Sequence, residues 1–369
     1  MKLVYLANAR IPTPRAYGLQ IMKTCEALAR AGTEVELVVP HRRASSGENP
    51  FSYYGVENRF TITTLRAPDL LSFGSFGFLI STLWFAEKAR WLRSFWKADA
   101  VYSRDALVLV QYLLLGRPLF FEAHAKPSFV SRIVARRAIY VVVISNGLRE
   151  AYENVGVSPE KIIVAADAVD EHLFDDVPAR EAARAELGLP ADATIALYAG
   201  HLYARKGADT LAAAARELPD TRSLFIGGAG PELAAFKAKW GSLPNVTIVG
   251  HVAHEKVPLY LRAADALVLP NSGKDEDSAR FTSPMKLFEY LASGTPIVAS
   301  DVPSLREILS NETAVLITPD DSHALAEGLT KTLQDRKAAT ARAKRALVLA
   351  QQHTWDKRAT AILAHCRGR

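Results

Sequence analysis

Short apolar runs alternate with amphipathic runs along almost the whole chain, and this alternation restricts the fold more than any other feature. Between residues 17 and 31 the apolar positions recur at helical spacing, and Gly32 follows them as a helix stop. Strands separated by helices form a parallel sheet that is covered on both faces. In the first half of the chain the alternation predicts strands over residues 2–7, 34–39, 100–102, 119–121 and 139–144.

A second alternating series follows a break in the pattern. Residues 170–191 are acidic at first and then contain Pro178, Gly188 and Pro190, so we interpret them as an interdomain linker. We therefore predict two doubly wound α/β domains, residues 1–180 and 181–352, with ligands bound at the carboxyl ends of the strands. In the second domain the predicted strands are 194–198, 223–226, 246–249, 266–269, 296–299 and 314–317, and the predicted helices include 207–217, 231–240 and 256–263.

Composition excludes several classes of protein. The chain has 369 residues and is 49% apolar, which fits two or three domains with full cores. Its two cysteines, Cys25 and Cys366, provide neither a disulfide framework nor a metal-ligand pair, so we expect a reducing cytoplasm. The N-terminus lacks the pattern of a signal peptide, and no apolar run reaches the ~18 residues of a membrane span.

Positive charge is concentrated in one part of the chain. Between Arg59 and Arg137 there are twelve Lys/Arg and five Asp/Glu, a net charge of +7, which leaves −1 for the remainder because the whole chain carries +6. Within this part, residues 79–96 interleave aromatic and aliphatic side chains with Lys88, Arg90 and Arg93. Such a helix suits the interface of an anionic membrane. A core helix with a charged outer face is the alternative.

One segment carries helix signals at both ends. Ser283 is predicted as the N-cap with Pro284 in the first helical position, and Gly294 is predicted to end the helix. Lys286 then lies in the first turn, where the helix dipole disfavours a cation, and a bound phosphate would resolve this conflict. Glu289, within one turn, is placed to accept hydrogen bonds from a ribose diol. The alternative is an ordinary capped helix with Lys286 in solvent.

Two glycine-bearing turns precede other predicted helices. The turn from Gly200 to Gly207 places Arg205 and Lys206 at a helix start, and two such misplaced cations indicate a shared diphosphate, although an exposed basic turn is the alternative. The turn from Gly227 to Gly230 lacks the spacing of the dinucleotide fingerprint, which argues against a nicotinamide cofactor. Its glycines suit close approach of a ligand or tight packing equally well.

In the first half, candidate site residues follow two predicted strands. Gly18 ends the loop after the first strand, and Glu122 and His124 lie at the end of another. A histidine held beneath a loop is the alternative interpretation. The acidic residues 275–277 lie in a polar loop without fixed ligand geometry, so no metal site is predicted there.

With these residues noted, the chain resembles the family 4 glycosyltransferases, which have the GT-B fold of two Rossmann-like domains facing a cleft. The resemblance covers almost the whole length. It implies transfer of a sugar from a nucleotide-sugar donor to a hydroxyl acceptor with retention of configuration, without a required metal or other cofactor. It also implies that a last helix, within residues 353–369, packs back on the first domain. The segments that carry it are the Gly18 loop, residues 122–124, 143–148, 168–174, 200–207, 227–230 and 250–252, and 283–296.

The resemblance assigns roles position by position. It makes Lys206, Arg205 and His124 the catalytic group, with His124 contacting the transferred sugar and the two cations holding the diphosphate. Glu122 lies beside His124 on the sugar or acceptor side. The implied donor-binding residues are Gly18, His201, Val252, Ser283, Pro284, Met285, Lys286, Leu287 and Glu289, with Val252 near the base.

Two positions depart from the family pattern. His201 stands where the family often has arginine, and Phe281 stands where it has a glutamate that binds a sugar hydroxyl. The donor sugar therefore stays open. We expect a glycan or lipid-linked acceptor, contact with an anionic membrane at its cytoplasmic face, and no nucleic-acid partner. A nucleotide-sugar epimerase or hydrolase, and a non-catalytic anion-binding scaffold, are the alternatives.

Overall fold

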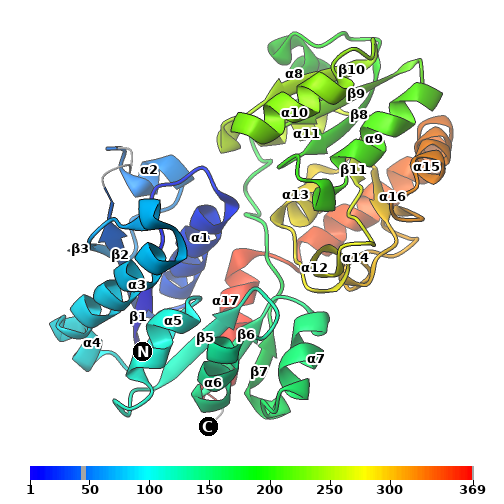
Figure 1. Ribbon diagram of the computed structural model, residues 1–369. Coiled ribbons are helices and arrows are strands. Elements are labelled where there is room, and N and C mark those ends of the chain that lie inside the picture. The colour runs from blue at the N-terminus through cyan, green and yellow to red at the C-terminus, as the bar shows by residue number, and fades with distance from the viewer. Residues whose placement is uncertain (43–46, 368–369) are drawn as a thin grey trace. The chain divides into compact units, whose positions relative to one another are not determined.

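The computed structural model describes residues 1–42 and 47–367, which form two compact units (Figure 1). The first unit runs to Asp167 and also contains the last helix, which begins at Trp355. The second unit runs from Ala168 to Thr354. Each unit is an α/β sandwich around one parallel sheet, so the predicted fold class is confirmed.

In the first unit the sheet has the strand order β3-β2-β1-β4-β5-β6-β7. Its central strands are continuous apolar runs, as expected for strands buried on both faces. The order reverses between β1 and β4, and ligands of doubly wound sheets bind at the carboxyl side of such a reversal. The strands are β1 (Lys2–Leu6), β2 (Glu34–His41), β3 (Thr61–Arg66), β4 (Ala100–Ser103), β5 (Leu119–Ala123), β6 (Tyr140–Val143) and β7 (Ile162–Val164).

Helices cover both faces of this sheet, and the last helix of the chain lies against the first one (Figure 1). The helices are α1 (Ala16–Arg30), α2 (Pro50–Tyr54), α3 (Gly74–Arg90), α4 (Arg93–Lys97), α5 (Ala106–Leu109), α6 (Phe129–Arg137), α7 (Asn146–Asn154) and α17 (Trp355–Arg367), with short 3-10 turns at Leu71–Phe73, Val110–Tyr112 and Pro159–Lys161. Cys25 on α1 is a buried free thiol, and the side chain of Cys366 falls outside the described residues.

In the second unit the strand order is β10-β9-β8-β11-β12-β13, with the reversal between β8 and β11. The strands are β8 (Thr194–Ala199), β9 (Thr221–Ile226), β10 (Val246–Gly250), β11 (Ala266–Leu269), β12 (Ile297–Ser300) and β13 (Val315–Ile317). The helices are α8 (Arg180–Leu187), α9 (Ala208–Ala214), α10 (Gly230–Trp240), α11 (Val257–Ala263), α12 (Glu276–Arg280), α13 (Met285–Ser293), α14 (Pro303–Arg306), α15 (Ser322–Gln334) and α16 (Arg336–Ala350), with 3-10 turns η4 (Ala204–Lys206), η5 (Ala215–Glu217) and η6 (His254–Lys256).

The interpretation of residues 170–191 as a linker is wrong for its second part, which forms α8. Ala183 on this helix packs against Leu259 and Ala263 of α11. Arg184 is buried, and its Nη2 lies 2.7 Å from Oδ2 of Asp265. Gly188, one of the residues that favoured a linker, instead ends the helix in the left-handed conformation with φ 63°. The helix is therefore an integral part of the second unit.

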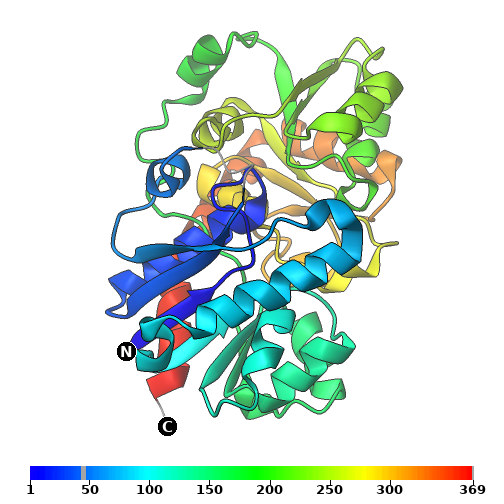
Figure 2. The same cartoon turned by 60° about the vertical axis from the view of Figure 1, so that its left-hand side comes forward.

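Residues 79–96 are not one helix but parts of α3 and α4, separated near Trp91. The buried side of α3 carries mostly small residues such as Gly77, Ser81 and Ala86. Its outer side carries aromatic residues instead of charges alone, since Phe76 is 70% and Trp84 49% exposed. The outer side therefore carries charged side chains, such as those of Glu87 and Lys88, together with aromatic ones. Figure 2 shows α3 as the long helix on the near side of the first unit. Among the described helices, none has the length and apolar character needed to cross a bilayer.

Candidate functional site

Glycine-bearing loops line the carboxyl edge of the second sheet. Gly200 follows β8 and Gly227 follows β9, with φ of 136° and 100°. A side chain at Gly227 would overlap the carbonyl group of Gly200, so the two loops pack backbone against backbone. Gly207, with φ 73°, packs equally closely against the carbonyl of Pro270, just beyond β11. These contacts bring the loops together at the reversal of strand order, where a ligand is expected.

The sequence predicted Arg205 and Lys206 at the start of a helix, but the structure places them before it. They form η4, and α9 begins only at Ala208 because Gly207 adopts the left-handed conformation at the N-cap. Arg205 is exposed, and its guanidinium carbon lies 6.0 Å from the ring centroid of Tyr203. Lys206 is half-buried. Both cations remain beside the glycine loops, but the helix dipole does not act against them.

Helix α13 begins one residue later than predicted. Pro284 occupies the N-cap position with φ −76° and ψ 120°, and no side chain caps the helix, so the assignment of Ser283 as N-cap is wrong. Its end is as predicted, with Gly294 left-handed at φ 70°. Leu287 is 1% exposed and points into the core, so only its backbone faces outward. Met285 is half-buried in the first turn. The N–H of Leu287 donates to the carbonyl of Pro284 at 2.8 Å. The N–H groups of Met285 and Lys286, at the start of the helix, can donate to an anion.

Lys286 lies in this first turn, as predicted, and its ammonium group is buried. In the part of the chain that the structure describes, no group accepts a hydrogen bond from Nζ. Nζ lies 3.9 Å from the ring centroid of Tyr198. Burial, and then the nearby charge of Lys206, hold the pKa of Lys286 well below its usual value. A buried cation without a hydrogen-bonding partner is costly, and this arrangement is therefore typical of a site that receives an anion.

Glu289 lies one turn further along α13 and has a partner that the sequence did not reveal. Its Oε1 lies 2.9 Å from Nε2 of His254, in η6, two residues beyond the half-buried Val252. The side chain of Glu289 is 12% exposed. His254 is a single histidine in a short loop without a recognisable pattern, and only its proximity to Val252 in the sequence pointed to it.

His201 anchors two loops instead of standing free. Its Nδ1 lies 2.9 Å from Oε1 of Glu232 in the first turn of α10, and its ring stacks on Tyr203 with centroids 5.1 Å apart. The hydroxyl of Tyr198 donates to the backbone carbonyl of His201 at 2.5 Å. This position, where an arginine is common, thus holds the glycine-bearing turns together.

Two further residues define this edge. Phe281 is 7% exposed, and its ring cannot replace the hydrogen bonds of a glutamate at this position. Asn271, just beyond β11, is fully buried, and in the described part of the chain no donor reaches its Oδ1. The sequence analysis missed Asn271, since one asparagine after a strand is no distinctive signal. Its unmet amide oxygen suits a ligand hydroxyl.

The candidate residues of the first unit form a buried network at the end of β5. Glu122 is fully buried, and its Oε1 lies 2.8 Å from Nε2 of His124. Burial and the charge of Arg104 lower the pKa of His124 to about 4, although Glu122 opposes the shift. Gly18 is on α1, and a side chain there would overlap the hydroxyl of Tyr54. Tight packing against Tyr54 is thus one physical reason for a glycine at this position.

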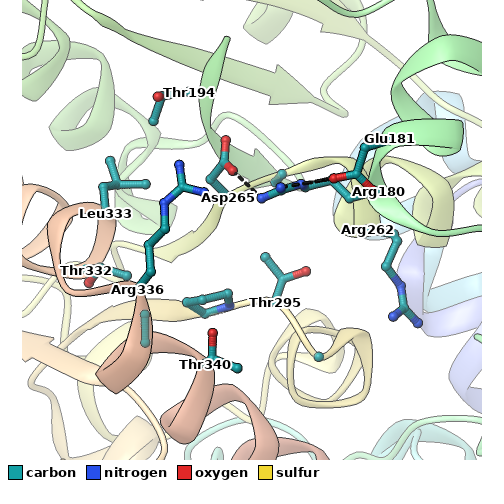
Figure 3. A pocket seen from close by; sticks show the side chains of 14 residues that line it. Arg180, Glu181, Thr194, Arg262, Asp265, Thr295, Thr332, Leu333, Arg336 and Thr340 are labelled. Atoms are coloured by element: carbon teal, nitrogen blue, oxygen red, sulfur yellow. Dashed lines mark hydrogen bonds and ion pairs between the residues drawn. The ribbon is translucent and has the colours of Figure 1, made fainter. Parts of the chain in front are cut away.

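A cavity of about 420 Å³ opens at the opposite edge of the second sheet, where the strands begin. Thr194 and Pro296, which precede or start strands, line it, and Figure 3 shows Arg180 held between Asp265 and Glu181. Its wall contains none of the predicted donor-binding residues. The carboxylates neutralise Arg180, but Arg262 and Arg336 also line this cavity, and Nε of Arg262 is buried without a hydrogen-bonding partner in the described part of the chain.

Comparison with known families matches both parts of the chain. Residues 19–173 match the family described as Glycosyltransferase Family 4, and residues 193–335 match Glycosyl transferases group 1. The chain belongs to the family 4 glycosyltransferases. It is similar to D-inositol 3-phosphate glycosyltransferase of Xylanimonas cellulosilytica, with 27% identity over 93% of this chain and 89% of that protein. It is also 32% identical to the putative teichuronic acid biosynthesis glycosyltransferase TuaC of Bacillus subtilis, over 63% of this chain and 57% of that one.

Solved structures place this family 4 glycosyltransferase in the GT-B fold. Sucrose-phosphate synthase of Thermosynechococcus elongatus has a TM-score of 0.82 at 22% identity and covers 99% of this chain and 98% of its own. Anabaena HepE in complex with UDP has a TM-score of 0.78 at 18% identity, with both chains covered completely. The predicted GT-B architecture and the assignment as a glycosyltransferase are confirmed.

Proposed function

We propose that this enzyme transfers a sugar from a nucleotide-sugar donor to a hydroxyl acceptor with retention of configuration. The observation that carries the proposal is the ammonium of Lys286, buried without a hydrogen-bonding partner in the described part of the chain. It lies beside the glycine-bearing loops, with Lys206 near enough to lower its pKa. A diphosphate is the ligand class that satisfies two close cations and the free N–H groups of the first turn of α13.

The proposed chemistry needs no protein nucleophile. As the bond between the sugar and the diphosphate breaks, negative charge grows on the leaving phosphate, and Lys206 and Lys286 stabilise it from fixed positions. Arg205 adds charge at the exposed side. The acceptor hydroxyl attacks the face from which the diphosphate departs, and a phosphate oxygen takes its proton. The two lysines supply the positive charge that a divalent metal supplies elsewhere, so the proposal assigns no metal or cofactor.

For the donor, the proposal places the diphosphate at Lys206 and Lys286, with the backbone of residues 283–287 around it. Glu289 accepts from the ribose hydroxyls, and Val252 lies near the base. The carboxylate of Glu289 is already held in place by His254, which leaves Oε2 for a second donor. HepE is similar in fold and was solved with UDP and with UDP-glucose, which supports a uridine nucleotide as the first probe. On the sugar side we assign His124, with Glu122 beside it, and Gly18 allows close approach to the diphosphate.

Calorimetric titration with UDP, GDP, ADP and their sugars tests the donor assignment. We expect one nucleoside diphosphate to bind, and Lys206→Ala to lower turnover tenfold or more without unfolding the protein. Lys331→Ala, on the exposed side of α15, is the control and should change neither. Absence of binding by every nucleotide, or full turnover in Lys206→Ala, contradicts the proposal. Release of nucleotide without acceptor, and no sugar transfer with it, would favour a hydrolase.

We further propose that the acceptor is a lipid-linked or other envelope glycan and that the enzyme reaches it at the cytoplasmic face of a membrane. The outer side of α3 supports this proposal. Phe76 and Trp84 are exposed there, and Nζ of Lys88 lies 5.5 Å from the Trp84 ring centroid. Arg93 and Lys97 on α4 are also exposed. Exposed aromatic rings flanked by cations suit the headgroup region of an anionic bilayer.

Co-sedimentation with vesicles of phosphatidylglycerol and phosphatidylcholine tests this surface. We expect binding at low salt that falls as phosphatidylglycerol is removed. The double variant Phe76→Ser/Trp84→Ser should bind at least about tenfold more weakly, since each buried aromatic ring contributes about 1.5–3 kcal/mol. Val348→Ser removes an exposed apolar side chain from α16 and serves as the control. Equal binding by the double variant and the control, or no binding of the wild type, refutes the membrane proposal.

A further inference from the structure

The last helix of the chain inserts an arginine beneath the candidate sugar site. Arg358 on α17 is 6% exposed, and its Nη2 lies 2.6 Å from Oε1 of Glu122. Its Nε donates to the backbone carbonyl of Ala166 at 3.0 Å, and Nη1 reaches Oγ1 of Thr24 at 3.4 Å. The guanidinium therefore joins α17, α1 and the end of β5. None of the sequence patterns pointed to it.

Glu122 is surrounded by hydrogen-bond donors. Besides Arg358, its Oε1 accepts from Nε2 of Gln20 at 2.7 Å, and its Oε2 accepts from the hydroxyl of Tyr102 at 2.6 Å. Burial by itself would raise the pKa of Glu122, but the charge of Arg358, the hydrogen bond from His124 and the charge of Arg104 hold it well below its usual value. Glu122 is thus a carboxylate at neutral pH, and a carboxylate only accepts hydrogen bonds.

This carboxylate decides which nitrogen of His124 carries the proton. Nε2 of His124 lies 2.8 Å from Oε1 of Glu122, so Nε2 must be the protonated nitrogen. Nδ1 is then left with a lone pair that accepts a hydrogen bond. The charged groups that face the ring are Arg104, Glu122 and Arg358. Burial, then the charge of Arg104 and to a smaller extent that of Arg358, keep the ring neutral. The other titratable groups around Glu122 are Tyr5, Tyr102 and Cys25, which burial keeps uncharged.

We propose that Arg358 is a positioning residue that holds Glu122 ionised and thereby fixes His124 as the neutral tautomer protonated on Nε2. His124 then offers Nδ1 as an acceptor to a hydroxyl of the sugar or of the acceptor, a step that rests on the proposed function. The last helix begins at Trp355, directly after the second unit in the sequence. Arg358 therefore completes this part of the first unit from the far end of the chain.

Nuclear magnetic resonance of protein labelled with 13C,15N-histidine tests the tautomer without an assay of activity. His124 is assigned by comparison with His124→Asn. In the wild type we expect a neutral ring protonated on Nε2 from pH 5 to 8. In Arg358→Met the loss of a cation near the ring should raise the pKa of His124 measurably, because the charged ring is then less disfavoured. Arg358→Lys keeps a positive charge and should largely restore the wild-type titration.

Arg30→Met is the matched control. Arg30 also links α1 to α17, through Asp356 at 3.3 Å, but it does not reach Glu122. This variant should leave the His124 signals unchanged, which separates loss of helix docking from loss of the charge. A wild-type His124 that is charged at pH 7 or protonated on Nδ1 overturns the proposal, even if Arg358→Met fails to fold. So does a folded Arg358→Met with unchanged His124 titration.

Kinetics distinguish this inference from the proposed function. We expect Arg358→Met to lower kcat by about tenfold or more and to leave the affinity for nucleoside diphosphate unchanged, since the charged residues assigned to the diphosphate, Lys206 and Lys286, lie in the second unit. If no nucleotide binds the wild type, the proposed function fails while the tautomer result still stands. If the wild type transfers sugar and Arg358→Met keeps full kcat, the positioning role is refuted.

Discussion

Replacing Lys286 by methionine should stabilise the free enzyme while weakening donor binding. The buried ammonium lacks a hydrogen-bonding partner in the described part of the chain, and such a group costs about 1–3 kcal/mol. Its contact with the Tyr198 ring, 3.9 Å from Nζ to the centroid, offsets about 0.5–2 kcal/mol of that cost. Methionine keeps most of the side-chain volume. We therefore expect the free second unit to gain about 1 kcal/mol, a rise in Tm of about 2–4 °C.

The same substitution removes a cation from the diphosphate site. A charge-assisted hydrogen bond contributes about 1.5–3 kcal/mol, so the affinity for nucleoside diphosphate should fall about ten- to a hundredfold. Turnover should fall at least as much, because charge on the leaving diphosphate is greatest in the transition state. Thermal unfolding and calorimetry on the same two proteins measure both effects.

The change of protein stability with pH gives a second, independent test of the buried ammonium of Lys286. The pKa of Lys286 is lower in the folded than in the unfolded protein, so the unfolded chain binds more protons between these two values. The free wild type should therefore become more stable as pH rises through this window toward about 10.4, the unfolded pKa. Lys286→Met should lack this part of the pH dependence. A methionine variant that is less stable than the wild type and binds nucleotide equally well would show that Lys286 has a structural role instead.

Two further substitutions test the packing around the site. Arg184→Met leaves the buried Asp265 with only one of its two arginines. It should lower the free energy of unfolding of the second unit by about 3–5 kcal/mol, measured by urea denaturation. A loss below about 1 kcal/mol would mean that α8 contributes little to the stability of that unit. Burial raises the pKa of the Cys25 thiol well above its usual value. In a Cys366→Ser variant, Cys25 should therefore react with a disulfide reagent only after the protein unfolds. Fast labelling of the folded protein would contradict the burial of Cys25.

The sequence predicted the strands at the centre of each sheet, but of the four edge strands it predicted β10 and β13 and missed β3 and β7. β1 and β11 are unbroken apolar runs, and their predicted positions agree with the structure. β3 was missed because it is an edge strand, and its polar residues 61–66 remain partly exposed. β7, also an edge strand, has only three residues. Hydrophobic pattern thus identifies the centre of a parallel sheet better than its edges.

The site was predicted where a residue breaks a local rule and was missed where it does not. Lys286 was found because a cation in a first turn is unfavourable, and Gly294 because its position needs a left-handed backbone. His254, Asn271 and Arg358 gave no such signal, since a polar residue becomes informative only when its burial and partners are known. The aromatic and basic residues of α3 were noted in the sequence, but which of them face outward was not, because the apolar residues of that helix are not confined to one face.

The two units hold their candidate residues in opposite states of hydrogen bonding. In the first unit both carboxylate oxygens of Glu122 are already paired, with Gln20, His124 and Arg358 at Oε1 and Tyr102 at Oε2. At the carboxyl edge of the second sheet, Oδ1 of Asn271, Nζ of Lys286 and Oγ of Ser300 are buried and, in the described part of the chain, unpaired. A ligand with both anionic oxygens and hydroxyl groups could form hydrogen bonds with all three of these side chains. Buried polar atoms without a partner also occur elsewhere in the described residues, among them the hydroxyl of Tyr5 and Nε of Arg262. The three at the carboxyl edge lie where a doubly wound sheet binds its ligand, so a bound ligand accounts for them.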